Sequence, residues 1–324
     1  MIIKASAPAK AILFGEHFVV KGYPAIAIAL DVRAYVHVRE TDKEYIKVRS
    51  IDLEEELIMS LDGNIIKNSS NLRPYVEVFE ALSEYTRPKP AYVEIKSNIP
   101  VAAGLGSSAS IAVALTAAYS KFLGIDLDLS EISSIAFKAE KIVHGKPSGI
   151  DNSIATYGGG IVFERGRVRE KINVEKLRDA IVIVANSGIE RSTRTAVLRV
   201  LELYEKYPSI LKHIYDASKT IIEEALEYIK KGMIKELGEL MNINHGLLSA
   251  IGVSIAELED LVYTARKAGA LGAKITGAGL GGCIIALTTS KEAEKVEKAL
   301  KSKAEWVLRA PISIRGVRIE QNIL

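Results

Sequence analysis

The sequence feature that most constrains the fold is a turn of small residues at positions 100–110, PVAAGLGSSAS, between a strand-like run and an apolar helix. The run covers residues 91–99, and the helix covers residues 108–123. Glycine lets backbone amides approach a ligand closely, and a helix start presents unpaired N–H groups and the positive end of its dipole. The pattern predicts a phosphate-binding turn that leads into a helix buried against a sheet.

This turn follows neither of two common phosphate-binding patterns. A Walker loop needs a lysine before its Ser or Thr, and a dinucleotide loop has three spaced glycines with an acidic partner downstream. Two consecutive hydroxyls, Ser107 and Ser108, are more than a tight turn requires. Either could cap the helix, and a hydroxyl that faces a triphosphate could hold Mg²⁺. A plain strand-to-helix connection is the alternative interpretation.

The rest of the chain predicts an α+β arrangement of strands and helices. In the first half, strands are expected at 2–5, 11–14, 25–29, 35–39, 45–49 and 92–96, and helices at 74–85, 108–123 and 130–143, the last capped by Ser130. In the second half, helices are expected at 192–207, 209–231, 234–248, 254–268 and 291–301, and strands at 181–185, 273–276, 283–288 and 305–309.

The chain length and a change in the residue pattern near residue 170 predict two domains. A chain of 324 residues accommodates two domains of ordinary size. Residues 167–180 are charged and weakly periodic, which indicates a link between domains. We therefore expect one compact domain at residues 1–178 and another at 179–324.

Composition excludes several classes of protein. The net charge of +3 comes from 43 basic and 40 acidic residues that are interspersed, so no nucleic-acid-binding face is expected. The single cysteine, Cys283, excludes an intramolecular disulfide and indicates a reducing compartment. The N-terminus lacks the apolar region of a signal peptide, and no apolar stretch is long enough to span a membrane. We expect a cytoplasmic protein that binds neither nucleic acid nor membrane.

Two further segments place isolated charged residues among small ones. Lys10 interrupts an apolar strand, and Glu16 and His17 follow a glycine between two strand-like runs. Each has an ordinary explanation, because a strand lysine usually faces solvent and a lone histidine is usually structural. Glu140 ends a helix, and Asp151 follows a glycine-bearing turn. Two carboxylates near a phosphate-binding turn suit a metal and the proton of a nucleophile, although Asp151 could simply cap the next element.

A glycine-rich turn between two strands, KITGAGLGGC at 274–283, completes the pattern, with four glycines in six positions where a plain hairpin needs fewer. Together with residues 8–29 and 99–110, this segment resembles the three motifs of the GHMP kinase family, named for galacto-, homoserine, mevalonate and phosphomevalonate kinases. The motifs occur in the family order, so the resemblance spans nearly the whole chain. The segments KAILFGEHFVVKGYPA (10–25), HGKPSGIDN (144–152) and NSGIERSTR (186–194) are most similar to the mevalonate kinase branch of the family.

The resemblance implies a two-domain GHMP kinase fold. Its N-terminal domain would be similar to domain 2 of ribosomal protein S5, its C-terminal domain would be a ferredoxin-like α/β sandwich, and the active site would lie between them. The implied reaction is ATP-dependent phosphorylation of the 5-hydroxyl of (R)-mevalonate in isoprenoid biosynthesis, with Mg²⁺ as cofactor and with mevalonate and ATP as partners. Many relatives are homodimers, and the amphipathic helices of the second half suit either such an interface or packing within the domain.

The resemblance also assigns roles to individual residues. The nucleotide phosphates would contact Pro100, Ala103, Gly104, Leu105, Gly106, Ser107, Ser108, Ala109 and Ser110, and the acceptor would contact Glu16, His17, Asp151, Thr193, Gly277 and Ala278. Ser108 and Glu140 would ligate Mg²⁺. Asp151 would accept the proton of the substrate hydroxyl, and Lys10 beside it would stabilise the developing charge. Most of the rate would come from alignment and charge neutralisation.

Other functions stay open on the sequence alone. A phosphomevalonate kinase or a mevalonate 3-kinase is the nearest alternative, but an added phosphate would need further Arg or Lys near Glu16 and His17, and no such cluster is present. A non-catalytic nucleotide-binding regulator of the same fold would not need Lys10, Glu140 and Asp151 together. A nucleotide-binding scaffold would transfer no phosphoryl group. The sequence does not indicate which residue pairs with the mevalonate carboxylate.

Overall fold

The computed structural model describes residues 2–101, 103–145 and 147–320, which divide into two compact units. The first unit consists of the chain up to Lys10, Val32–Gly158 and the residues from Arg315 onward, and the second consists of Ala11–Asp31 and Gly159–Ile314. The sequence predicts one boundary, after residue 178, whereas both units combine separate segments. The reason is that two long strands, β1 (Ile2–Phe14) and β2 (Ala25–Glu40), each contribute residues to both units.

Strands β1 and β2 are longer than the sequence pattern predicts. The runs expected at 2–5 and 11–14 form one strand of 13 residues, and those expected at 25–29 and 35–39 form one strand of 16 residues. Alanine, proline and aspartate between the runs have low strand propensity and hide the continuity. The hydrogen bonds to neighbouring strands outweigh that local preference.

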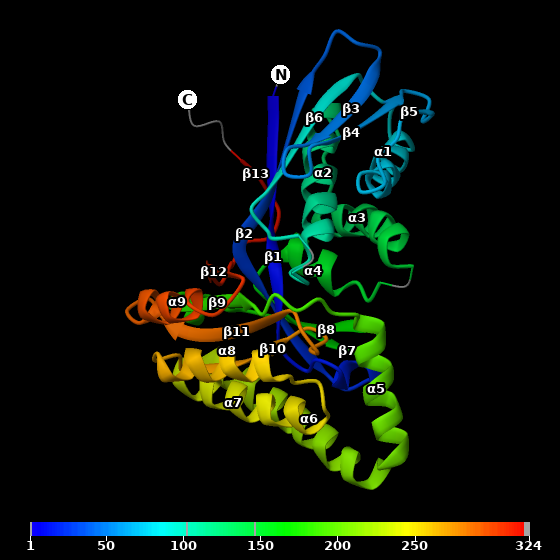
Figure 1. The fold of residues 1–324 in the computed structure, drawn as a ribbon. Helices are drawn as coiled ribbons and strands as arrows, with labels where there is room; N and C mark the ends of the chain where they lie inside the picture. The colour runs from blue at the N-terminus through cyan, green and yellow to red at the C-terminus, as the bar shows by residue number, and fades with distance from the viewer. Residues whose placement is uncertain (1, 102, 146, 321–324) are drawn as a thin grey trace. The chain divides into compact units, whose positions relative to one another are not determined.

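The first unit is built on a sheet with the strand order β13–β1–β2–β6–β3–β4–β5. The additional elements (Figure 1) are β3 (Tyr45–Ser50), β4 (Glu55–Ser60), β5 (Ile65–Lys67), β6 (Ala91–Ser97) and β13 (Arg318–Ile319), with helices α1 (Val76–Ser83), α2 (Ser107–Leu123), α3 (Leu129–His144) and α4 (Ile150–Tyr157). β3 runs parallel to β6. β13 runs antiparallel to β1, with Arg318 opposite Ser6.

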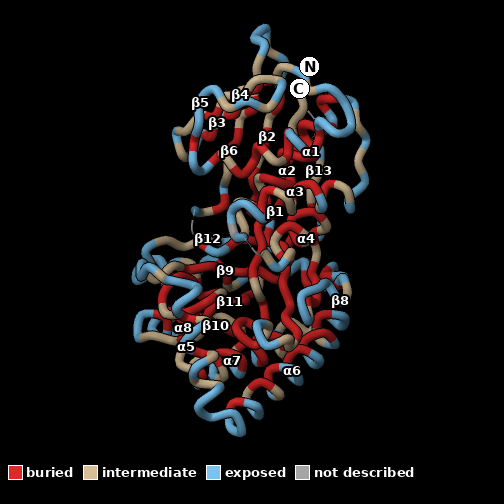
Figure 2. Tube along the Cα trace, turned by 90° about the vertical axis from the view of Figure 1, so that its right-hand side faces the viewer, coloured by how far each residue is buried: buried red, intermediate tan, exposed pale blue. Residues whose placement is uncertain are grey.

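Helix α2 is a buried helix of the first unit, as the sequence predicts (Figure 2). Tyr119 is fully buried, and the centre of its ring lies 4.9 Å from that of Phe79 and 5.9 Å from that of Phe122. Gly124 ends the helix in a left-handed conformation. Most side chains of α2 are buried, which anchors the helix in the core of the first unit.

The start of helix α3 differs from the prediction. Its N-cap is Asp128 and not Ser130. The Asp128 carboxylate accepts hydrogen bonds from the amides of Ser130 and Glu131, and the Glu131 carboxylate accepts one from the Asp128 amide. This is a capping box, in which two backbone donors are satisfied reciprocally. The prediction of Ser130 as the cap was wrong because the Asp128 carboxylate, two residues earlier, binds the amides of Ser130 and Glu131 and so starts the helix before Ser130.

The second unit contains a sheet with the strand order β10–β11–β9–β12. Its strands are β9 (Ala180–Asn186), β10 (Gly272–Thr276), β11 (Cys283–Thr289) and β12 (Trp306–Pro311), and its helices are α5 (Thr193–Lys206), α6 (Pro208–Lys231), α7 (Ile234–Ala250), α8 (Ala256–Lys267) and α9 (Ala293–Lys301). These bounds confirm the elements expected between residues 181 and 309 to within one turn. Over the described ranges of both units, none of the helices has the length and hydropathy that crossing a membrane requires.

Residues 167–180 are structured where the sequence predicts a link. β7 (Gly160–Glu164) pairs with the first part of β2 and with β8 (Arg167–Ile172), and a 3-10 helix follows at Glu175–Leu177. In the described sheet, β8 has β7 as its partner. Charged side chains are common on such an edge strand because they discourage pairing with other chains. The same charges made the segment resemble a link.

Candidate functional site

The turn at 100–110 enters helix α2 through Gly106, which is the N-cap of the helix. Gly106 has a φ of +75°, in the left-handed region that favours glycine. A Cβ atom here would lie 3.1 Å from Cγ of Lys10 and 3.5 Å from Oδ2 of Asp151. Glycine therefore allows the backbone at the helix start to come close to both side chains.

Lys10 and Asp151 form an ion pair beside this turn. Lys10 Nζ lies 3.3 Å from Asp151 Oδ1. The exposed fraction is 11% for the Lys10 side chain and 30% for the Asp151 side chain. The backbone amide of Lys10 donates to the Leu105 carbonyl over 2.9 Å, which ties β1 to the turn. Asp151 lies in the first turn of α4, whose N-cap is Gly149, so Asp151 does not cap this helix. The structure thus places a cation and a carboxylate next to a helix start.

Ser108 and Glu140 meet between helices α2 and α3. Ser108 Oγ donates to Glu140 Oε1 over 2.6 Å, and only 2% of Glu140 is exposed. Ser107 Oγ lies instead 3.3 Å from Oγ of Ser97. Within the described part of the chain, neither hydroxyl caps α2. The positive end of the α2 dipole is therefore not compensated by a capping side chain, which favours an anion at this point.

The other residues of the turn differ in exposure and in use. Pro100 is half-buried, Ala103, Leu105 and Ala109 are buried, and Gly104 is exposed. Ser110 Oγ donates to the Pro8 carbonyl over 2.8 Å, and the Ser110 amide donates to the Gly106 carbonyl over 3.0 Å. Both donors of Ser110 are therefore used within the protein. Its geometry suits holding the turn in place better than contacting a ligand.

A cavity of about 190 Å³ lies between the two carboxylates of this region. It is lined by Glu140, Pro147, Ser148, Gly149, Asp151 and Asn152. Mg²⁺ prefers oxygen ligands and usually takes one or two carboxylates together with substrate phosphates. The hydroxyl of Ser108 and the carboxylate of Glu140, which are already in contact, have the donor chemistry that a magnesium ion requires.

In the second unit, Glu16 forms an ion pair with Lys274. Lys274 lies in the middle of β10. Both side chains are buried, with exposed fractions of 0% for Lys274 and 1% for Glu16. Lys274 Nζ also donates to the Ile275 carbonyl over 2.6 Å. Burial lowers the pKa of Lys274, and the Glu16 carboxylate opposes this shift. The pair fastens the segment before His17 to β10.

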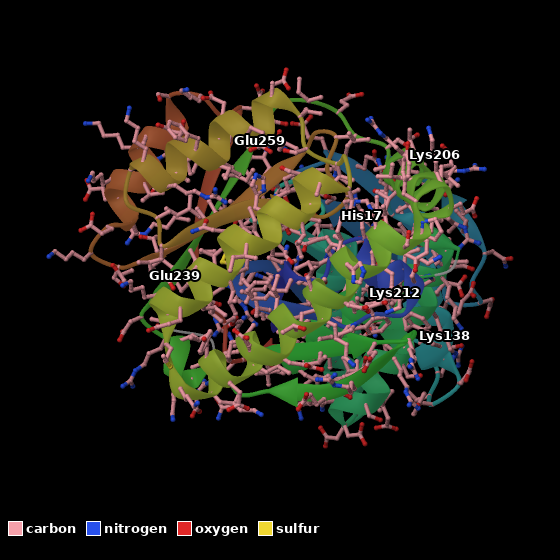
Figure 3. All side chains as sticks on the ribbon, turned by 90° about the horizontal axis from the view of Figure 1, so that it is seen from below. His17, Lys138, Lys206, Lys212, Glu239 and Glu259 are labelled. Atoms are coloured by element: carbon pink, nitrogen blue, oxygen red, sulfur yellow. The ribbon has the colours of Figure 1, made fainter. Side chains whose placement is uncertain are left out.

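His17, which Figure 3 labels, is held by the glycine-rich turn of the same unit. Its Nε2 lies 2.7 Å from the Ala278 carbonyl, and 6% of the residue is exposed. Burial lowers the pKa of His17, although the hydrogen bond to Ala278 raises it in part. The ring is therefore neutral at pH 7, and Nε2 carries the proton because a carbonyl only accepts. Nδ1 is left as an acceptor.

The glycine-rich turn also packs on Arg191. A Cβ atom at Gly277 or at Gly282 would lie 2.7 Å from Nη1 of Arg191, so a side chain at either position would displace the guanidinium. Arg191 Nη1 donates to the Thr276 carbonyl over 3.2 Å. Thr193, expected at the acceptor, stands apart as an exposed residue at the first position of α5.

Two residues of this region could not be assigned a role from the sequence. Lys274 and Arg191 lie in segments that the sequence marks as unusual, but no role followed from their positions. A lysine in the short apolar strand β10 is a usable signal, because a buried lysine needs an anion nearby. That anion, Glu16, is 258 residues away in the chain, and only the fold identifies it.

Comparisons with known proteins identify the family. The family model for the N-terminal domain of GHMP kinases matches residues 73–160, and the model for their C-terminal domain matches residues 225–305. The mevalonate kinase of Thermococcus sibiricus is 40% identical to this chain, over 100% of this chain and 100% of its own length. The mevalonate kinase of Pyrococcus abyssi is also 40% identical, over 99% of this chain and 98% of its own length. The crystal structure of L. major mevalonate kinase in complex with R-mevalonate is 31% identical, with a TM-score of 0.82 over 95% of each chain. The chain therefore belongs to the GHMP kinase family and has its two-domain fold of mixed α/β content.

Proposed function

We propose that this protein is a mevalonate kinase, which transfers the γ-phosphoryl group of ATP to the 5-hydroxyl of (R)-mevalonate and yields 5-phosphomevalonate and ADP. The observation that carries the proposal is the Lys10–Asp151 pair beside the Gly106 turn. A proton acceptor and a cation stand there next to a helix start suited to phosphate. The similarity to mevalonate kinases over the full length supports mevalonate as the acceptor.

In this proposal the first unit binds the phosphates and activates the hydroxyl. The amides of the turn and of the first turn of α2 donate to phosphate oxygens. Asp151 accepts the proton of the substrate hydroxyl, while Lys10 Nζ stabilises charge on the transferring oxygens. Ser108 and Glu140 would hold Mg²⁺, which would supply neutralisation of phosphate charge. Alignment of the two reactants accounts for much of the remaining rate.

The second unit supplies the proposed contacts with the acceptor. The Nδ1 of His17 is buried and has no hydrogen-bond partner among the described residues, so it can accept from a hydroxyl of mevalonate. Glu16 precedes it and is fixed by Lys274. Thr193, Gly277 and Ala278 are the further contacts that the family resemblance implies.

A substrate panel tests the proposed function. ADP release is measured with mevalonate, phosphomevalonate, homoserine and galactose, and we expect kcat/KM for mevalonate to exceed that for each other compound by at least about 100-fold. Identification of the product by ³¹P NMR distinguishes the 5-phosphate from the 3-phosphate. Preference for phosphomevalonate, or formation of the 3-phosphate, would replace the proposal by one of its nearest alternatives. Absence of turnover with all four would contradict a role as a kinase of these substrates.

Replacing Glu140 with glutamine tests the proposed magnesium ligand. Glutamine keeps the shape of the side chain but removes the negative charge that faces Ser108. We expect the Mg²⁺ concentration for half-maximal activity to rise by about 10- to 100-fold, while KM for mevalonate stays unchanged. The matched control is Glu84→Gln, which removes an exposed carboxylate paired with Lys138 and should leave the magnesium dependence as it is. An unchanged dependence in Glu140→Gln would contradict the ligand role.

A further inference from the structure

The C-terminal segment at Arg315–Glu320 contacts both elements that carry the Lys10–Asp151 pair. Its strand β13 pairs with β1 at Ser6, four residues before Lys10. Its Val317 amide donates to the Thr156 carbonyl over 3.1 Å, in the last turn of the helix that begins near Asp151. One short segment therefore joins the strand of Lys10 to the helix of Asp151.

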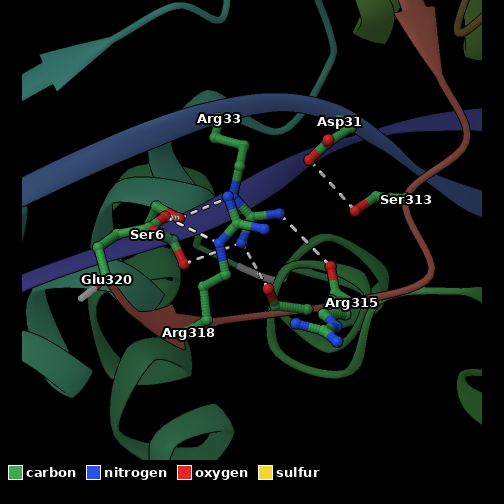
Figure 4. Close-up of polar contacts among 8 residues, drawn as sticks. Ser6, Asp31, Arg33, Ser313, Arg315, Arg318 and Glu320 are labelled. Atoms are coloured by element: carbon green, nitrogen blue, oxygen red, sulfur yellow. Dashed lines mark hydrogen bonds and ion pairs between the residues drawn. The ribbon is translucent and has the colours of Figure 1, made fainter. Parts of the chain in front are cut away.

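A buried arginine fastens this segment (Figure 4). Arg33 is 2% exposed and lies in β2. Its Nε donates to Ser6 Oγ over 2.7 Å, and its Nη2 donates to the carbonyls of Ser6 and Gly316 over 3.1 and 2.6 Å. The guanidinium group holds its donors in a planar fork, so one side chain can bind two backbones in a fixed geometry. Arg33 thereby bridges β1 and the C-terminal segment.

Glu320 belongs to the same hydrogen-bonded cluster as Arg33 and Ser6. Its carboxylate accepts hydrogen bonds from Ser6 Oγ and from Arg318 Nε, the latter over 2.8 Å. Burial raises the pKa of Glu320, but the hydrogen bonds from Ser6 and Arg318 outweigh it, and the pKa is lowered overall. Glu320 is thus an anion at neutral pH, opposite a group of cations that includes Arg33.

The backbone of the segment lies directly on the end of α4. A Cβ atom at Gly316 would lie 2.0 Å from the Thr156 carbonyl oxygen and 2.4 Å from the Thr156 carbonyl carbon. Both atoms belong to backbone, so a side chain at Gly316 could be accommodated only by moving the segment away from the helix or by shifting the helix. The contact leaves no room for the two elements to slide.

We propose that the C-terminal segment is a positioning device for the phosphoryl-transfer site, with Arg33 as its main positioning residue. It fixes helix α4 relative to strand β1 and so sets the separation of Asp151 from Lys10. A helix transmits such a constraint because it is rigid, and Thr156 is only about 8 Å along the axis from Asp151. This inference rests on the proposed function, because it assigns a consequence to the Lys10–Asp151 geometry.

The test is Gly316→Ala, a change of one methyl group. At a temperature well below the melting temperature of the variant, we expect kcat to fall by about 10- to 100-fold with KM for ATP unchanged, because a displacement near 1 Å has such an effect on an aligned reaction. The matched control is Gly246→Ala on α7, where an added Cβ would meet no atom within 4 Å, and its kcat should equal that of the unchanged protein. Arg33→Lys keeps the charge but cannot bridge both backbones, and it should lower kcat in the same way.

Two readouts separate positioning from simple loss of stability. In the Asp151→Asn background, Gly316→Ala should change the residual rate by less than about twofold, because the effect acts through Asp151. Amide hydrogen exchange in peptides that cover residues 150–158 should be faster in Gly316→Ala and in Arg33→Lys than in the control, whatever the enzyme phosphorylates. The exchange measurement does not depend on knowing the substrate.

The possible failures are distinguishable. If the unchanged protein phosphorylates none of the panel, the proposed function fails, and the positioning role, which rests on it, fails as well. If the unchanged protein is active and both variants keep its kcat, the positioning role alone is wrong. It is equally overturned if Gly316→Ala lowers the rate by the same factor with and without Asp151, since the segment would then contribute only stability.

Discussion

The Asp151→Asn variant is expected to lose activity by about 10³- to 10⁴-fold in kcat while it still binds ATP with nearly unchanged affinity. Asparagine has the same shape as aspartate but cannot accept the hydroxyl proton. The proposed phosphate donors lie on the turn and on α2, whereas Asp151 lies on α4. Single-turnover measurement with mevalonate gives the rate, and titration calorimetry gives the affinity for ATP.

A surface variant controls for the loss of an ion pair as such. Asp126→Asn removes an exposed carboxylate that lies 2.8 Å from Lys121 in the same unit, and its kcat should be unchanged. Near-normal turnover of Asp151→Asn would refute the assignment of the proton acceptor. Equal loss of ATP binding and of rate would show that Asp151 contributes to nucleotide binding instead.

The second large effect is expected on stability, in the Glu16–Lys274 pair of the second unit. Glu16→Gln leaves the Lys274 ammonium fully buried without the carboxylate that balances it, and Lys274→Met removes the cation from the buried Glu16. Each substitution should lower the free energy of unfolding by about 3–5 kcal/mol. The double variant should lose less free energy of unfolding than the sum of the losses in the two single variants. The reason is that it leaves neither a buried cation nor a buried anion without its partner. Chemical denaturation monitored by circular dichroism measures all three.

Lys212→Met is the matched control for this pair. Lys212, which Figure 3 labels, lies on α6, 2.5 Å from Asp216, but 63% of its side chain is exposed. Solvent screens such a pair, so its loss should cost no more than about 1 kcal/mol. Additive losses in the Glu16→Gln and Lys274→Met double variant would mean that the two buried charges stabilise the unit independently, contrary to our interpretation.

Local patterns predict where the candidate site residues close to a turn lie in the fold. The alternation of glycine and small residues before α2 predicts a helix start open to phosphate, and in the structure Gly106 is the N-cap of α2, with no capping side chain. The segments around Glu140 and Asp151 were expected near this turn, and both side chains line one cavity beside it. Such features depend on residues that are near in sequence or on motifs with a fixed geometry.

Contacts between distant segments could not be predicted in this way. The partner of Glu16 is Lys274, and the partners of Arg33 include Gly316, and no periodicity or spacing encodes either pairing. The segment 167–180 resembles a link in its sequence because edge strands such as β8 and links are both rich in charged residues. A single boundary near residue 178 cannot describe these units, because β1 and β2 each contribute residues to both of them.

The pairing of β1 with β13 also determines when the first unit can finish folding. Ser6 and its hydrogen-bond partner Glu320 are 314 residues apart in the chain, so β1 is synthesised long before Arg318 and Glu320. Until they emerge, the nascent polypeptide has β1 as an exposed sheet edge, which is prone to mispairing with other chains. A transcript truncated before codon 315 would therefore produce a polypeptide with an incomplete N-terminal sheet, and such a product should depend strongly on chaperones and be degraded rapidly.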